Sequence, residues 1–309
     1  MDDGSDVECR IKGNFRIRGI RSTNPVAVGD IVVVESQKSK VESNDSGFWI
    51  TDIEERRNYI IRRSTNLSKE SHILAANIDQ VSLVVTVNHP VTSTIFIDRF
   101  LATCEAYRVP AILIFNKIDL MTEEESAYID ELRTLYESIG YKTIEISALE
   151  ISTNPLTTHP LTQLLAGKVT LLSGNSGVGK STLLNALFGK ELTRTGKISD
   201  AHDKGMHTTT FSEMYFLNEA NSQLPIVNGQ IIDTPGIKGF GTIDFEREEV
   251  CHFFPEIFAV SRDCRFSNCL HTNEPGCAVQ EALIKGNIAI SRYESYLSIL
   301  GDCQESKYR

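Results

Sequence analysis

The sequence predicts a central α/β domain with a mainly parallel sheet. A small antiparallel β domain precedes it, and a helical segment with a metal site follows it. Three observations predict this arrangement. Short runs of alternating apolar and polar residues fill residues 7–55, buried strands alternate with amphipathic helices from about residue 78, and cysteines gather with a histidine at 264–277. We therefore expect three domains, at residues 1–65, 66–240 and 241–309.

Composition limits the classes of protein to consider. The net charge of −10 argues against a chain that coats nucleic acid by bulk electrostatics. Seven cysteines, an odd number, fit a reducing compartment with a metal site better than a disulfide framework. The acidic opening MDDGSDVECR is no signal peptide, and the longest apolar runs are too short to span a bilayer. We expect a soluble, monomeric, cytoplasmic protein with no membrane partner.

The first domain reads as short strands with Gly, Asn and Asp between them: VECRIK, FRIRGI, DIVVVES and GFWITDIEE. Basic residues follow these strands, and Trp49 and Phe48 are aromatic groups that could stack on bases. This pattern fits a local phosphate-binding face for RNA, but it also fits an ordinary solvated sheet face. The basic residues are Arg10, Lys12, Arg16, Arg18, Arg21, Arg56, Arg57, Arg62 and Arg63.

In the second domain, strands and helices alternate. Thr122 and Glu125 form a capping box that starts one of the helices. After about residue 241 no strand pattern remains, and two helical stretches flank the Cys/His segment. The predicted strands are 80–87, 111–115, 142–147 and 168–173, and the predicted helices are 95–107, 122–136, 160–167 and 180–189.

A glycine-rich loop at Gly174 is the strongest single signal. The pattern Gly-x4-Gly-Lys-Ser follows a strand and opens a helix, which is the context of a phosphate-binding loop rather than of a chance glycine-rich turn. Lys180 can reach the β- and γ-phosphates, and the Ser181 hydroxyl can bind Mg²⁺. The predicted phosphate-binding residues are Gly174, Asn175, Ser176, Gly177, Val178, Gly179, Lys180, Ser181 and Thr182.

The stretch FNKID, residues 115–119, predicts guanine recognition. Asp119 can accept hydrogen bonds from guanine N1–H and N2–H₂, which adenine does not offer. Asn116 would brace the loop and touch N7, and Lys117 would lie along the base face. The next strand ends in Ser147 and Ala148, where a backbone N–H could meet guanine O6. Alone, the Asn-Lys-x-Asp pattern also fits a polar loop after a strand.

A third motif, QIIDTPG, ends at Gly236. An apolar strand followed by Asp-x-x-Gly places Asp233 near the Mg²⁺ and the Gly236 N–H near the γ-phosphate. In the preceding loop GMHTTTF, either Thr208 or Thr209 could complete the Mg²⁺ shell, although a plain polar loop would look the same. The base-reading loop therefore comes first in the chain and the phosphate loop later. This is a circular permutation of the usual GTPase order.

These motifs together resemble the circularly permuted small-ribosomal-subunit biogenesis GTPases, the RsgA or YjeQ/YloQ family, over almost the whole chain. The resemblance implies an OB-fold before the permuted GTPase domain and a zinc domain after it. It also implies a small-subunit rRNA partner. Three thiolates and one imidazole form a closed tetrahedral structural zinc site; buried free cysteines with a surface histidine are the alternative. The predicted ligands are Cys264, Cys269, His271 and Cys277.

One departure concerns the first domain. OB-folds of the family begin with a strand before the part that resembles VECRIKGNFRIRGI, and here the chain starts almost at that second strand. Either the barrel is open on one edge, or the true start lies upstream of Met1.

Ile237 stands where many GTPases place a glutamine that orients the attacking water. His207 resembles the histidine proposed to do this in the family, although it also fits a solvated loop histidine. We expect an enzyme that hydrolyses GTP to GDP and phosphate with Mg²⁺, activated by the small ribosomal subunit. A regulatory rRNA-binding module that holds GTP with little catalysis is the alternative. An ATP-using enzyme is excluded if Asp119 reads guanine.

Overall fold

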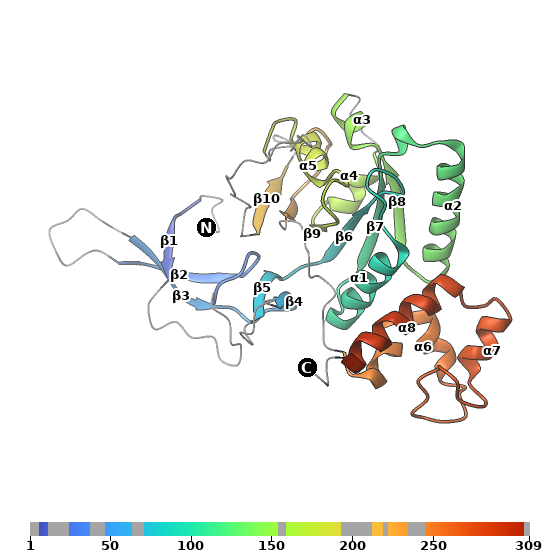
Figure 1. The fold of residues 1–309 in the computed structure, drawn as a ribbon. Helices are drawn as coiled ribbons and strands as arrows, with labels where there is room; N and C mark the ends of the chain where they lie inside the picture. The colour runs from blue at the N-terminus through green and yellow to red at the C-terminus, as the bar shows by residue number, and fades with distance from the viewer. Residues whose placement is uncertain are drawn as a thin grey trace, which may run out of the picture. The chain divides into compact units, whose positions relative to one another are not determined.

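The computed structural model describes residues 6–11, 25–37, 47–63, 71–153, 159–192, 212–218, 222–233 and 245–305 (Figure 1). The chain divides into two compact units, Met1–Ile78 and Asp79–Arg309. In the described part of the chain, the first unit consists of strands and turns. The second unit holds a six-stranded sheet and the helices.

The first unit contains two small sheets. Strands β1 (Cys9–Ile11), β2 (Val32–Gln37) and β3 (Gly47–Ile53) lie in the order β1-β3-β2, and β4 (Tyr59–Arg63) pairs with β5 (Ser71–Ala76). The pairs β2–β3 and β4–β5 are antiparallel, as predicted. Strand β1, however, runs parallel to β3, so the prediction of a wholly antiparallel domain was wrong. Alternation of apolar and polar residues marks the buried face of a strand and carries no information about its direction.

The β4–β5 pair also spans the boundary that we predicted at residue 65, and the first unit extends to Ile78. The stretch FRIRGI lies outside the described residues. The OB-fold, the closure of its barrel and the division into three domains stay predictions.

Two arginines from the predicted RNA face are engaged within the first unit. Arg56 donates through Nε and an NH2 group to the buried carboxylate of Asp30, at 2.6 and 2.7 Å. Arg57 donates to the carbonyl oxygen of Asn77 at 3.0 Å. The guanidinium of Arg10 lies 6.0 Å from the ring centre of Trp49. Lys12, Arg16, Arg18 and Arg21, and the side chains of Arg62 and Arg63, lie outside what the structure describes.

The second unit is built on a sheet with the order β10-β11-β9-β6-β7-β8. Its neighbours are parallel except β10 and β11, which are antiparallel. The carboxyl ends of five strands therefore meet at one edge, although the chain visits them in another order. The strands are β6 (Gln80–Val85), β7 (Ala111–Asn116), β8 (Lys142–Ile146), β9 (Val169–Ser173), β10 (Glu213–Leu217) and β11 (Gly229–Asp233).

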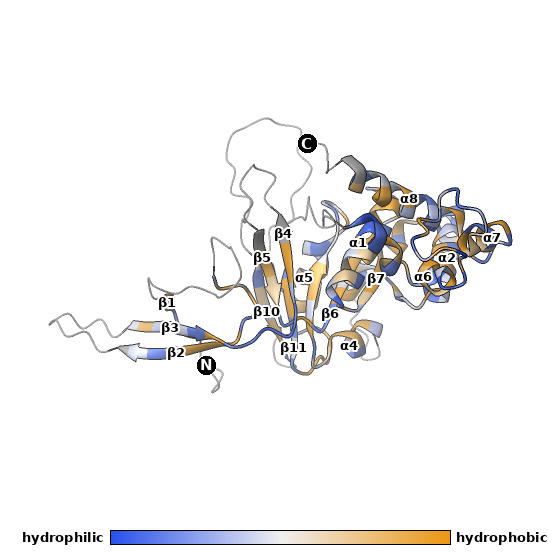
Figure 2. Ribbon diagram, turned by 90° about the horizontal axis from the view of Figure 1, so that it is seen from below, coloured by the Kyte–Doolittle hydropathy of each residue, from blue (hydrophilic) through white to orange (hydrophobic). Residues whose placement is uncertain are grey.

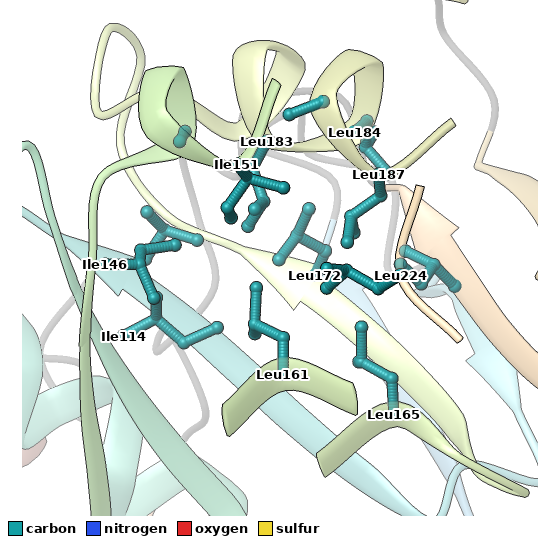
Figure 3. Close-up of a cluster of buried hydrophobic side chains, with 14 of the residues drawn as sticks. Ile114, Ile146, Ile151, Leu161, Leu165, Leu172, Leu183, Leu184, Leu187 and Leu224 are labelled. Atoms are coloured by element: carbon teal, nitrogen blue, oxygen red, sulfur yellow. The ribbon is translucent and has the colours of Figure 1, made fainter. Parts of the chain in front are cut away.

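Helices cover both faces of this sheet, as the predicted alternation requires. Figure 3 shows leucines and isoleucines of α3 (Ala148–Thr153), α4 (Pro160–Leu165) and α5 (Lys180–Phe188) packed on those of the strands. Helices α1 (Thr94–Tyr107) and α2 (Glu123–Ser138) lie on the other side of the sheet (Figure 1). The predicted capping box of Thr122 and Glu125 is present at the start of α2. The strand and helix assignments of the α/β part are thus confirmed, to within a few residues.

Residues 245–305 form helices joined by turns: η2 (Arg247–Phe253), α6 (Pro255–Ser261), α7 (Ala278–Ile284) and α8 (Ile290–Glu305). The helices show both hydrophilic and hydrophobic colours in Figure 2, as amphipathic helices do. Their apolar side chains form a core of their own, which includes Phe254, Ile257 and Tyr296 and reaches Ala102 of α1. The described helices include none long and apolar enough to cross a membrane.

A buried ion pair joins the C-terminal helices to the α/β part. Arg292 of α8, only 1% exposed, donates to Asp98 of α1 and to Glu256 of α6, each at 2.7 Å. The Tyr136 hydroxyl of α2 donates to the same Asp98 oxygen at 2.8 Å. Burial opposes the charge of Arg292, but Asp98 and Glu256 outweigh it and raise the arginine's pKa, so the guanidinium stays charged. Helices α1 and α8 also carry a more exposed ion pair, Arg99 and Asp302.

Candidate functional site

The phosphate loop joins β9 to α5, as the motif predicts. Gly174 and Gly179 have φ angles of +143° and +100°, which residues other than glycine rarely adopt. A Cβ at Gly174 would overlap the carbonyl oxygen of Val84 in the neighbouring strand β6. A Cβ at Gly179 would overlap the side-chain amide of Asn116. Glycine is therefore needed at both positions because the backbone of the loop passes directly against its neighbours.

Lys180 begins helix α5 and turns back over the loop. Its Nζ donates to the carbonyl oxygens of Gly174 and Asn175, at 2.7 and 2.8 Å. Burial lowers the pKa of Lys180, and the nearby carboxylate of Asp233 partly restores it. The ammonium is thus held at the loop, where an anion would stabilise its charged form. Ser181 and Thr182 follow in the first turn of α5.

Asn116 ties the predicted base-reading segment to the phosphate loop. Its side chain is buried, its Nδ2 donates to the Val178 carbonyl oxygen at 2.8 Å, and its Oδ1 accepts from the Ala148 N–H at 3.0 Å. Val178 lies 62 residues away along the chain and Ala148 lies 32 residues away. Three segments that were chosen from sequence as parts of one site are therefore joined by a single side chain.

Lys117 makes a second connection. The residue is in the left-handed region, with φ +67°, and its Nζ donates to the carbonyl oxygens of Gly177 and His89, at 2.8 and 2.5 Å. Asp119 follows in the short turn η1 (Ile118–Leu120), and its carboxylate is exposed, as base recognition requires. The contact with His89 was not predicted, because nothing in the stretch TVNHPVT resembles a nucleotide motif.

Ser147 and Ala148 lie beside this loop, at the end of β8 and the start of α3. The Ser147 hydroxyl accepts from the Glu150 N–H at 3.3 Å and so helps to start α3. The Ala148 N–H is engaged by Asn116 rather than pointing freely into the site. A contact from this segment to guanine O6 stays a prediction.

Asp233 is the last residue of β11, which pairs with β9, and its negative charge partly offsets the lowering of the Lys180 pKa by burial. The edge of the sheet thus brings Asp233 to the phosphate loop, as the third motif predicts. His207, Thr208, Thr209 and Gly236 lie outside the described residues.

The second cluster is the Cys/His group between α6 and α7. The ligand atoms of Cys264, Cys269, His271 and Cys277 all lie within 4.8 Å of one another. The Sγ atoms of Cys264 and Cys277 are 3.9 Å apart, and His271 Nδ1 is 3.6 and 3.5 Å from them. A tetrahedron with Zn–S bonds of about 2.3 Å has sulfur–sulfur edges of about 3.8 Å. The donor set and its spacing therefore fit a zinc ion bound through His271 Nδ1.

Side chains outside the cluster hold its backbone, and the sequence analysis missed them. The Glu274 carboxylate accepts from the N–H groups of Leu270, Thr272 and Asn273 at 2.8–3.1 Å. Burial raises the pKa of Glu274, but these backbone bonds outweigh it, and the pKa lies below its ordinary value. Tyr293 donates to the His271 carbonyl oxygen at 2.7 Å. The only sequence signal for these roles was a glutamate inside the ligand spacing.

Cys251 and His252 are a second cysteine–histidine pair near the metal site, but they are not members of the cluster. Burial raises the pKa of the Cys251 thiol, and the His252 ring packs edge-on against Phe258 at 4.7 Å. Both residues line a cavity of about 560 Å³ next to the metal site.

Comparison with known proteins adds to this geometry. The model of the family described as RsgA GTPase matches residues 53–243. The small ribosomal subunit biogenesis GTPase RsgA 2 of Bacteroides thetaiotaomicron is 57% identical over 308 residues, covering 100% of this chain and 94% of the relative.

Two solved structures are similar over nearly the whole chain. The crystal structure of YjeQ from Thermotoga maritima has a TM-score of 0.68 at 31% identity, covering 96% of this chain and 90% of that one. The crystal structure of YloQ, described as a circularly permuted GTPase, has a TM-score of 0.66 at 27% identity, covering 98% and 88%. With its permuted order of motifs around a single sheet edge, this chain belongs to the RsgA GTPase family.

Proposed function

We propose that this protein hydrolyses GTP to GDP and phosphate in the late maturation of the small ribosomal subunit. The observation that carries the proposal is the double hydrogen bond of Asn116, which unites the base-reading and phosphate-binding segments. A nucleotide bound across the carboxyl ends of β7 and β9 would meet Asp119 with its base and Gly174–Thr182 with its phosphates. Binding at this edge is the rule for open α/β sheets.

The described residues of the nucleotide site have the following roles in this proposal. Asp119 accepts the two guanine hydrogen bonds, and Lys117 lies along the base. Lys180 exchanges the carbonyl oxygens of Gly174 and Asn175 for the β- and γ-phosphates. Ser181 and Asp233 would hold Mg²⁺, which would neutralise charge on the phosphates during transfer to water.

The proposal assigns the attacking water to His207, since Ile237 has no polar group to orient it. Thr208 or Thr209 completes the Mg²⁺ shell, and the Gly236 N–H meets the γ-phosphate. Slow turnover by the isolated protein follows, because in this proposal a bound partner brings His207 to the attacking water.

The partner that we propose is the small subunit and its rRNA, because the relatives are named for its biogenesis. The first domain, proposed as an OB-fold, offers Arg10 beside Trp49. The helical domain holds one structural zinc ion and offers Arg262 over Phe258 and Arg265 over Phe266 beside the cavity. Such pairs of arginine and aromatic ring suit phosphates and unpaired bases. We also propose that the protein acts in the cytoplasm, where small subunits mature, and that it acts as a monomer.

The test is steady-state hydrolysis by the purified protein alone and with isolated small subunits, with ATP and large subunits as controls. Stimulation confined to GTP and the small subunit is expected. Slow hydrolysis unchanged by either subunit would instead favour a regulatory module that holds GTP.

The base assignment has its own test. Asp119→Asn keeps an acceptor for N1–H but exchanges the other acceptor, opposite the guanine 2-amino group, for a donor. Xanthine has a carbonyl oxygen at that position, so the preference should shift from guanine to xanthine nucleotides. Unchanged GTP affinity in this variant would remove Asp119 from the site.

A further inference from the structure

A segment without any recognised motif lies between the two nucleotide-binding loops. Residues 86–92, here named the bridging loop, leave the sheet at the end of β6, which lies between β9 and β7. The loop is closed on itself: the Thr92 N–H donates to the Thr86 carbonyl oxygen at 2.8 Å, and the Thr86 hydroxyl donates to the Pro90 carbonyl oxygen at 2.5 Å. A strand between the phosphate strand and the base strand necessarily ends beside both loops.

The bridging loop contacts both loops. His89 offers its carbonyl oxygen to Lys117 Nζ, which at the same time donates to the Gly177 carbonyl oxygen. Pro90 packs against Gly177, where an added Cβ would lie 3.4 Å from the proline ring. Lys117 is thus held between the phosphate loop and the bridging loop.

A third contact reaches the far end of the base-reading turn. Asn88 Nδ2 donates to Glu125 Oε1 at 2.7 Å, while Glu125 Oε2 accepts from the Thr122 N–H at 2.9 Å. A capping box needs only one carboxylate oxygen of its glutamate. The second oxygen of Glu125 is therefore spare for the cap, and Asn88 uses it.

The turn that carries Asp119 is consequently fixed at both ends. Asn116 and Lys117 hold its start, and Thr122, through Glu125 and Asn88, holds its end. Asp119 itself is exposed between these points. The position of its carboxylate thus depends on side chains that lie outside the Asn-Lys-x-Asp motif.

We propose that Asn88 is a positioning residue for guanine recognition, acting through Glu125 on the turn that presents Asp119. The inference rests on the proposed function, in which Asp119 reads the base. Asn88 makes no contact with the nucleotide in this arrangement. Its loss should loosen the base-reading turn and leave the phosphate loop, which is braced by Asn116 and Lys180, in place.

The readout is the ratio of affinities for GDP and IDP, because inosine lacks the N2 amino group that Asp119 accepts from. A general loss of protein stability weakens the binding of GDP and IDP alike and leaves the ratio of their affinities unchanged. Because Asn88 acts only through Glu125, part of the contribution of this hydrogen bond should reach the base, and Asn88→Ala should reduce the ratio about three- to tenfold. Titration with the two diphosphates, at a temperature where melting curves show every variant folded, measures it.

Two further variants isolate the contact. Ser93→Ala removes a cap hydrogen bond to the Phe96 N–H immediately after the bridging loop and should leave the ratio at the native value. In a Glu125→Ala background, Asn88→Ala should have no further effect, since its partner is already gone.

The outcomes separate this inference from the proposed function. Native protein that binds IDP, or ADP, as tightly as GDP would overturn base reading by Asp119 and this inference with it. A native preference for GDP that survives intact in Asn88→Ala would overturn the positioning role alone. An equal effect of Asn88→Ala in the native and Glu125→Ala backgrounds would show that Asn88 does not act through Glu125.

Discussion

The metal centre and the nucleotide site differ in how far apart their residues lie along the chain. All four candidate metal ligands come from residues 264–277, and their supporting glutamate lies among them. The nucleotide site instead joins Asn116, Ala148 and Val178, which only the sheet brings together. One site is local and the other depends on tertiary structure.

This difference sets what each site depends on. The ligands lie in residues 262–277, which form turns and bends rather than helix or strand. A bound ion would therefore supply much of the free energy that orders this loop. The nucleotide site is held by strands whose interior side chains are almost fully buried, and its braces are hydrogen bonds between protein groups. We therefore expect loss of metal to unfold the first site, and loss of one brace to weaken ligand binding at the second without unfolding it.

The largest effect should follow from loss of a metal ligand. Cys277→Ser removes a buried thiolate, and structural zinc sites contribute about 10–16 kcal/mol of apparent binding free energy. Bound zinc should be lost and helical structure in the C-terminal segment with it, as measured by metal analysis and circular dichroism. Cys251→Ala is the matched control, since Cys251 is another buried cysteine near the metal site and does not belong to the cluster. Zinc retained by Cys277→Ser would contradict the assignment of ligands.

Loss of the buried ion pair between the C-terminal helices and the α/β part should give the next largest effect. Arg292→Met leaves Asp98 and Glu256 buried without their cation, which typically costs about 3–5 kcal/mol of folding free energy. Denaturant unfolding measures it. The control is Arg99→Met, because Arg99 of α1 pairs with Asp302 of α8 near the surface. This substitution should cost about 1 kcal/mol of folding free energy or less. Equal costs would mean that burial of the pair is unimportant.

Asn116→Ala should act on the nucleotide site alone. It leaves the Val178 carbonyl oxygen and the Ala148 N–H without their partner, each at a cost of about 1–3 kcal/mol. Nucleotide affinity should fall about 30-fold or more while zinc content stays unchanged, as calorimetric titration and metal analysis would record. A parallel loss of zinc would show that the two sites are not separable.

The smallest effect should come from the support of the metal loop. Glu274→Gln replaces a carboxylate that accepts three backbone hydrogen bonds with a neutral amide that also carries donors. Zinc affinity should fall about 10- to 100-fold, the usual consequence of losing an outer-shell partner. Competition with a chromophoric chelator measures this. Glu281→Gln, at an exposed position of α7, serves as the control.

Local patterns predicted the α/β part well. The strands at 80–87 and 111–115 and the helix opened by the capping box of Thr122 are present because periodicity and capping are written in adjacent residues. Strand direction in the first unit was predicted wrongly for β1, since direction depends on which strands meet. Arg56 was grouped with RNA-binding residues, yet its partner Asp30 lies 26 residues away and could not be identified by pattern.

The sequence by itself determined most elements of the α/β part, the permuted order of the motifs and the cluster of three cysteines and one histidine. Each element, motif and cluster is formed by residues close together in the chain. Only the tertiary structure decided that Asn116 braces the phosphate loop, that Asn88 reaches Glu125 and that Arg292 is buried against Asp98. These contacts join residues 37–194 positions apart. No pattern in neighbouring residues encodes them, because a polar side chain looks the same in sequence whether it faces water or a partner brought to it by the sheet.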